Sequence, residues 1–120
     1  MRFAAALSLI LFLACSSTPD KFVFPAAAGD WSLDALADSS AAGPGGQQAV
    51  YRDSNATVLT VRVEQMGPAE AFERVQKSRP EPGLLYFHHQ SYFITVRGDG
   101  VANDRMNEFA AALEKQLSTR

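Results

Sequence analysis

Two adjacent histidines, His88 and His89, are the side chains of this sequence best suited to acid–base or metal chemistry. Histidine titrates near neutral pH and is the commonest metal ligand in proteins. Neighbouring side chains on a strand point to opposite faces, so the pair would chelate one metal only if a turn aimed both rings the same way. The chain has no third histidine, and further ligands would have to be carboxylates. Solvated histidines in a turn are therefore the favoured interpretation, and a metal site is the alternative.

The sequence contains no other arrangement typical of an enzyme. The glycine-rich stretch at 43–46 lacks the lysine and the following helix of a phosphate-binding loop. No Gly-x-Ser-x-Gly nucleophile elbow is present. The single cysteine, Cys15, excludes an intramolecular disulfide and a cysteine-based zinc site. We therefore expect no catalytic residue and no cofactor.

Two phenylalanines, Phe87 and Phe93, are candidates for a contact surface instead. In the expected strand that contains Phe93, Ile94 and Val96 would face the core, which leaves Phe93 on the wet face. Phe87 would join it from the partner arm of a hairpin. Aromatic side chains on an open sheet face are typical of a contact patch. Alternatively, the apolar segment 22–24 folds back and covers that face.

Composition places the chain among ordinary globular proteins. It has 120 residues, of which 47% are hydrophobic and 20% are charged, and its net charge is −2. These values fit one domain and argue against a disordered or fibrous chain. No cluster of basic residues offers an electrostatic footprint for nucleic acid.

The start of the chain has the layout of an export signal. Arg2 supplies a positive charge, and residues 3–14 form an apolar run whose one polar member is Ser8. This run is shorter than the roughly 20 apolar residues that a spanning helix needs. It matches the apolar part of a secretory signal peptide.

Residues 11–15, which end in Ala14 and Cys15, resemble the lipobox of bacterial lipoproteins. The resemblance implies a signal peptide over 1–14 and a lipidated Cys15, carrying a thioether-linked diacylglycerol and an amide-linked acyl chain such as palmitate. Two or more acyl chains give lasting membrane anchorage. Ser16 after the cysteine looks like the version sorted to an outer membrane. A plain secretory peptide cut elsewhere is the alternative.

The remaining chain predicts a lipidated tether over 15–28 and a single domain over 29–120, with a mobile loop at 37–48. Thr57 to Gln65 is the clearest strand, because apolar and polar residues alternate along it. The expected elements are strands at 31–33, 50–52 and 57–65, a helix from Pro68 that ends before Pro80, a hairpin with arms 84–87 and 92–97, and a last helix capped by Asn103 or Asp104. Residues 34–37 are expected to form a turn or a short piece of helix.

This order, β-β-β-α-β-β-α, predicts an α+β two-layer domain: an antiparallel sheet of about five strands with two helices on one face. Residues 61–117 also resemble a group of bacterial lipoproteins of unknown function, through the stretches at 63–72 and 91–96. The resemblance supports the architecture and transfers no catalytic residue.

Together these features predict a lipid-anchored protein of the bacterial cell envelope, with its domain in the periplasm or at the cell surface. The leading hypothesis is a non-enzymatic binding module whose partners are the membrane, through Cys15, and another envelope protein. The alternatives are a small metal-binding protein or metal-dependent enzyme that uses His88 and His89, and a carrier with a ligand cavity between helices and sheet.

Overall fold

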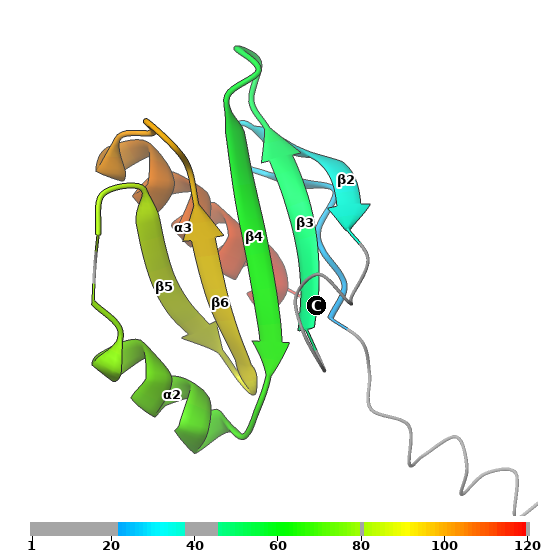
Figure 1. The fold of residues 1–120 in the computed structure, drawn as a ribbon. Helices are drawn as coiled ribbons and strands as arrows, with labels where there is room; N and C mark the ends of the chain where they lie inside the picture. Colours follow the sequence, from blue (N-terminus) through cyan, green and yellow to red (C-terminus); the bar gives the residue numbers. More distant parts are fainter. Residues whose placement is uncertain (1–21, 38–45, 80, 120) are drawn as a thin grey trace, which may run out of the picture.

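The computed structural model describes residues 22–37, 46–79 and 81–119, and it confirms an α+β fold (Figure 1). Six strands form one antiparallel sheet in the order β1-β2-β3-β4-β6-β5. The strands are β1 (Ala27–Ala28), β2 (Trp31–Ala37), β3 (Gly46–Arg52), β4 (Val58–Gln65), β5 (Leu84–His89) and β6 (Tyr92–Arg97). The helices are α2 (Pro68–Lys77) and α3 (Asn103–Ser118).

The central strand β4 has the alternation that the sequence predicts. Leu59, Val61 and Val63 are buried on one face of the sheet. Arg62 lies on the other face and is exposed. This period of two fixes which face of the sheet carries the core.

Helix α3 covers the core face, behind the sheet in Figure 1. Its buried residues are Met106, Phe109, Leu113 and Leu117, which share one side of the helix. The ring of Phe109 packs edge-on against Trp31 and Tyr51, with centroids 5.8 and 5.1 Å away. These aromatic contacts join α3 to β2 and β3.

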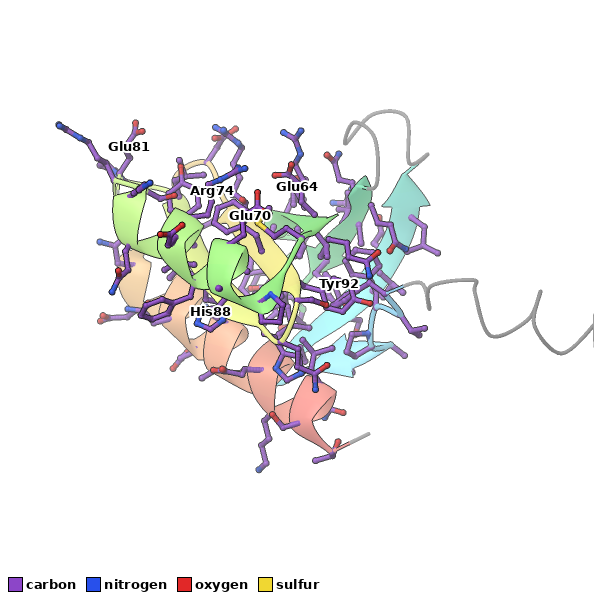
Figure 2. The ribbon with its side chains drawn as sticks, turned by 90° about the horizontal axis from the view of Figure 1, so that it is seen from below. Glu64, Glu70, Arg74, Glu81, His88 and Tyr92 are labelled. Atoms are coloured by element: carbon purple, nitrogen blue, oxygen red, sulfur yellow. The ribbon has the colours of Figure 1, made fainter. Side chains whose placement is uncertain are left out.

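Helix α2 packs against the opposite face, so the prediction of two helices on one face is wrong. The strand register pairs His88 with Phe93 and thus places both on the face away from α3. Phe72 and Arg74 of α2 contact those two rings. Seen from below, β5 and β6 lie between the two helices (Figure 2). The core face is already filled by α3, and the aromatic rings on the other face of β5 and β6 supply the surface that α2 covers.

The segment 22–28 belongs to the domain, and the boundary predicted at residue 29 is too late. Phe22 and Phe24 are buried in the core cluster. The backbone N–H of Phe22 donates to Gln47 Oε1, and Gln47 Nε2 donates back to the Phe22 carbonyl. The hydroxyl of Tyr51 donates to the Pro25 carbonyl over 2.6 Å. Burial of two phenylalanine rings therefore anchors this segment to the sheet.

Strands β2 and β3 are longer than the sequence predicts. Residues 34–37, expected as a turn or a piece of helix, continue β2, and 35–37 pair with β3 beyond a register shift at Asp34. Gln47 and Gln48, assigned to the loop 37–48, belong to β3. With β1 added, the sheet has six strands in place of about five. Residues 38–45 lie outside the described residues.

Candidate functional site

The two histidines lie in strand β5 and not in a turn, since the turn of this hairpin is Gln90-Ser91. As adjacent strand residues they face opposite sides of the sheet. His88 contacts Phe72 of α2, and its Nδ1 is buried without a hydrogen-bond partner among the described residues. Within residues 22–37, 46–79 and 81–119, no three His, Cys, Asp or Glu side chains group as a metal site requires. The pair therefore does not converge on a common metal position.

Phe87 and Phe93 do not form a shared exposed patch. Phe93 is on the predicted face but only 4% exposed, because Tyr86 stacks on it at 5.7 Å and the Arg74 guanidinium lies 5.3 Å from its ring centroid. Phe87 is opposite Ile94 in the register and packs against the core on the other face. Phe93 is covered by side chains of β5 and α2, whereas Phe22 and Phe24 of segment 22–24 pack in the core cluster.

The predicted lipidation site, Cys15, and the signal peptide lie outside the described residues. Among the residues that the structure does describe, no helix combines the length and the apolar character needed to cross a bilayer.

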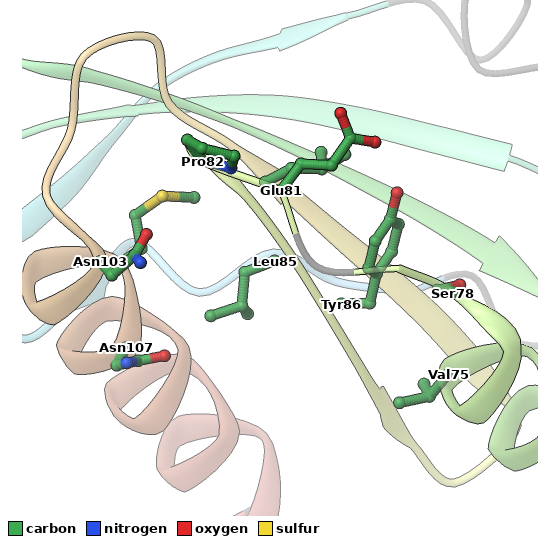
Figure 3. Close-up of a pocket in the computed structure, with 10 residues that line it drawn as sticks. Val75, Ser78, Glu81, Pro82, Leu85, Tyr86, Asn103 and Asn107 are labelled. Atoms are coloured by element: carbon green, nitrogen blue, oxygen red, sulfur yellow. The ribbon is translucent and has the colours of Figure 1, made fainter.

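The structure adds a groove that no sequence pattern identified. It has a volume of about 470 Å³ and lies between α2 and α3, beside the edge strand β5 (Figure 3). This volume is within the range of ligand-binding clefts. The groove is lined by Val75 and Ser78 of α2, Glu81 and Pro82 of the following loop, Leu84, Leu85 and Tyr86 of β5, and Asn103, Met106 and Asn107 of α3. We call it the α2–α3 groove.

The α2–α3 groove exists because the two helices lie on opposite faces of the sheet at the same edge. Each helix covers one face of β5, and neither closes the space beyond the strand. Leu85 and Val75 stay half-buried at this site and give it apolar surface. Figure 3 shows Leu85 between Asn107 on one wall and Val75 on the other. Helix packing thus leaves apolar side chains at the bottom of an open depression.

The polar groups of the α2–α3 groove suit hydrogen bonding. Glu81 is the acidic side chain of its lining, and among the described residues no histidine, cysteine or lysine lines the groove. The lining also offers two carboxamides, Asn103 and Asn107. The site can bind a partly apolar ligand and orient it by hydrogen bonds.

Asn103 is available to the groove because it does not cap the helix. The sequence predicted Asn103 or Asp104 as the N-cap of α3, but the N-cap is Ala102 and no side chain caps it. Asn103 is therefore the first helical residue, and its carboxamide lines the groove. Asn107 follows four residues later, which is the spacing that places two side chains on one side of a helix. The spacing of four residues between the two asparagines is the sequence signal that could have indicated this pair of side chains.

A second, more polar depression, of about 370 Å³, surrounds an ion pair between Asp53 and Arg105 that is buried only on the Asp53 side. The Asp53 side chain is 4% exposed, and its Oδ2 accepts a hydrogen bond from Arg105 Nη2 over 2.7 Å. Its Oδ1 accepts the backbone N–H groups of Asn55 and Thr57. The Arg105 guanidinium also lies 4.9 Å from the Trp31 ring centroid. These contacts fasten the turn between β3 and β4 to α3, so we assign this pair a structural role.

Because of the Asp53–Arg105 ion pair, we expect the free energy of unfolding to fall in acid. Burial of the carboxyl acts to raise the pKa of Asp53, but hydrogen bonds from Thr57, Arg105 and Asn55 outweigh it and hold the pKa below its ordinary value. A folded-state pKa below the unfolded value gives stability that is present above about pH 4 and is lost as the pH falls through the folded pKa. We expect Asp53→Asn to lower the free energy of unfolding at pH 7 and to flatten its decline below pH 4.

Urea unfolding of both proteins at pH 7, 5, 4 and 3 measures this difference. Asp99→Asn is the matched control, because Asp99 is an exposed turn residue and its substitution removes the same charge. Equal dependence on pH in the parent and Asp53→Asn would show that the carboxylate does not contribute in this way.

Comparison with known proteins finds no family model, no curated protein and no solved structure that matches this chain.

Proposed function

We propose that this protein is a lipid-anchored protein of the bacterial cell envelope, that its domain is a non-enzymatic binding module, and that the α2–α3 groove is its binding site. The observation that carries the binding role is the groove itself, in which apolar surface and two carboxamides meet without an acid–base pair. The apolar run at 3–14 and Cys15 after it support the anchor.

The groove also explains where binding energy would come from. Half-buried Leu84, Leu85 and Val75 lose their remaining contact with water when a ligand covers them. Each Å² of apolar surface removed from water contributes roughly 25 cal/mol. The carboxamides then set orientation, since a polar group left unpaired under a ligand costs free energy. A mixed lining of this kind is typical of sites that bind a protein partner or a small ligand.

A metal-binding protein or a metal-dependent enzyme that uses His88 and His89 is the second candidate. One observation favours it, because His88 Nδ1 is buried without a hydrogen-bond partner among the described residues. The opposite directions of the two rings weigh against a shared ion. The α2–α3 groove is therefore the better-supported site.

Site-specific photo-crosslinking in intact cells tests the binding role. A photoreactive amino acid replaces Asn107 in the groove or Gln116 on the same helix. Gln116 is exposed, about 13 Å further along α3 and on the opposite side of it. We expect a defined crosslinked partner from position 107 and none from position 116. When this partner is purified, we expect the Val75→Arg variant to bind it more weakly than the parent does. The same products from both positions would contradict a site in the groove.

The anchor is tested in the same cells with Cys15→Ser. We expect this variant to leave the membrane fraction and to lose labelling by radioactive palmitate, because the chain has no second cysteine to acylate. Ser16→Ala keeps the cysteine and serves as the control that should remain in the membrane. Equal labelling of Cys15→Ser and the parent would refute the lipoprotein assignment.

A further inference from the structure

We propose that the ligand of the α2–α3 groove is an extended polypeptide segment whose backbone is recognised by Asn103 and Asn107. This inference rests on the proposed function of the groove and specifies the class of partner.

The spacing of the two carboxamides matches an extended peptide. Residues four apart on an α-helix are separated by about 6 Å along the axis. An extended chain repeats its backbone groups every two residues, over about 6.7 Å. A carboxamide carries a donor and an acceptor side by side, so it can pair with the C=O and N–H of a peptide backbone. Asn103 and Asn107 can thus bind alternate residues of one extended strand.

The other side of the α2–α3 groove offers backbone hydrogen bonds as well. The N–H of Gly98 donates to the Gly83 carbonyl over 2.9 Å, which fixes the alternation between β5 and β6. Backbone groups of Leu85 then point to β6, and those of Tyr86 point to the open edge of β5. Within the described residues, the backbone N–H and C=O of Tyr86 make no backbone hydrogen bond to another strand, helix or loop. An unpaired N–H and C=O at a sheet edge bind an extended chain.

The side chains that line the groove indicate what the peptide carries. Leu85 and Val75 offer an apolar position between the two helices. Glu81 is the charged residue of the lining and lies at the end of the groove where β5 begins. Its carboxylate favours a cationic group nearby. The expected ligand is therefore an extended segment with an apolar residue followed or preceded by Lys or Arg.

A second copy of this domain fits the groove less well than a single segment. Strand β5 is flanked by α2 on one face and α3 on the other (Figure 2). The same strand of another copy would bring its own two helices to the same place, and helices need interaxial distances of 8–10 Å. A lone extended segment has no such bulk, and it can reach the Tyr86 backbone between the helices.

The test uses the full-length protein in detergent and a phage-displayed library of random twelve-residue peptides. A selected peptide is synthesised, and its Kd is measured by fluorescence polarisation with the parent, Asn107→Leu and Gln116→Leu. We expect Asn107→Leu to weaken binding at least tenfold and Gln116→Leu to leave the Kd unchanged. Circular dichroism confirms that each variant is folded, which is expected because both side chains are exposed.

Single N-methylation along the selected peptide distinguishes backbone recognition from side-chain recognition. We expect losses of tenfold or more at alternate residues and little effect between them. Enrichment of no peptide, equal Kd values for the parent and Asn107→Leu, or losses without alternation would each overturn the peptide inference. If crosslinking at position 107 still captures a partner that Val75→Arg weakens, the binding function stands and only its ligand class is wrong.

Discussion

Phe109→Ala is expected to lower the free energy of unfolding by about 3–5 kcal/mol, the usual cost of truncating a buried phenylalanine. Phe109 is fully buried, and its ring contacts Trp31 and Tyr51 from two different strands. Its removal leaves a cavity between α3 and the sheet that these large rings cannot fill without moving. Because domains of this size are stable by about 5–15 kcal/mol, the variant loses a large share of its stability.

Phe72→Ala is the matched control for Phe109→Ala. It makes the same chemical change on α2, where the ring is 49% exposed and contacts the His88 ring. We expect it to cost about 1 kcal/mol, in line with the value of one aromatic pair. Urea unfolding followed by circular dichroism gives both free energies. Similar losses in the two variants would mean that α3 is not packed on the sheet as described.

The parts of the fold that were predicted correctly have a signal within one element. The alternation in β4 and the apolar stripe of α3 record in the sequence which side each element buries. Strand β2 does not show a regular alternation of apolar and polar residues, because its register shifts between Leu33 and Ala35 and breaks the period of two. Such a bulge interrupts the pattern without ending the strand, so the sequence of 34–37 resembles a turn or a piece of helix.

The side on which α2 packs had no comparable signal. The helix buries only Ala71 deeply and covers Phe93 with the long side chain of Arg74. A charged residue that covers an aromatic ring looks like a solvent-exposed position in the sequence. The prediction therefore offered an open contact patch or cover by segment 22–24 for Phe93, and it placed both helices on one face of the sheet.

The α2–α3 groove could not be predicted for the same reason. Its walls come from α2, the following loop, β5 and α3, and they meet only because the two helices lie on opposite faces of the sheet edge. The residue ranges of these elements are close to the predicted ones, but their arrangement is not, and Asn103 was expected as a helix cap. Histidines are recognisable as candidate ligands from their residue type alone, whereas the groove depends on an arrangement in space.

The start of β5 forms one end of this groove, and there two glycines, Gly83 and Gly98, approach each other closely. We therefore expect Gly83→Ala to lower the free energy of unfolding substantially. Gly83 has φ +78°, and a Cβ there would lie 2.7 Å from the Gly98 carbonyl oxygen. The left-handed conformation costs a residue with a Cβ about 1–2 kcal/mol. Moving the backbone away from the clash also strains the Gly98 N–H bond to Gly83, worth about 1 kcal/mol. We expect a total loss of about 2–3 kcal/mol.

Gly100→Ala separates the two contributions to that loss. Gly100 has φ +72°, close to that of Gly83, but a Cβ there would meet no atom within 4 Å. This variant should therefore show only the conformational cost of about 1–2 kcal/mol. Urea unfolding measures both, and hydrogen exchange at the Gly98 amide should accelerate in Gly83→Ala alone. Equal losses and equal exchange would show that the contact between residues 83 and 98 does not hold β5 against β6. A larger loss and faster exchange in Gly83→Ala would show that this contact holds the start of β5, where Pro82 and Leu84 beside Gly83 line the groove.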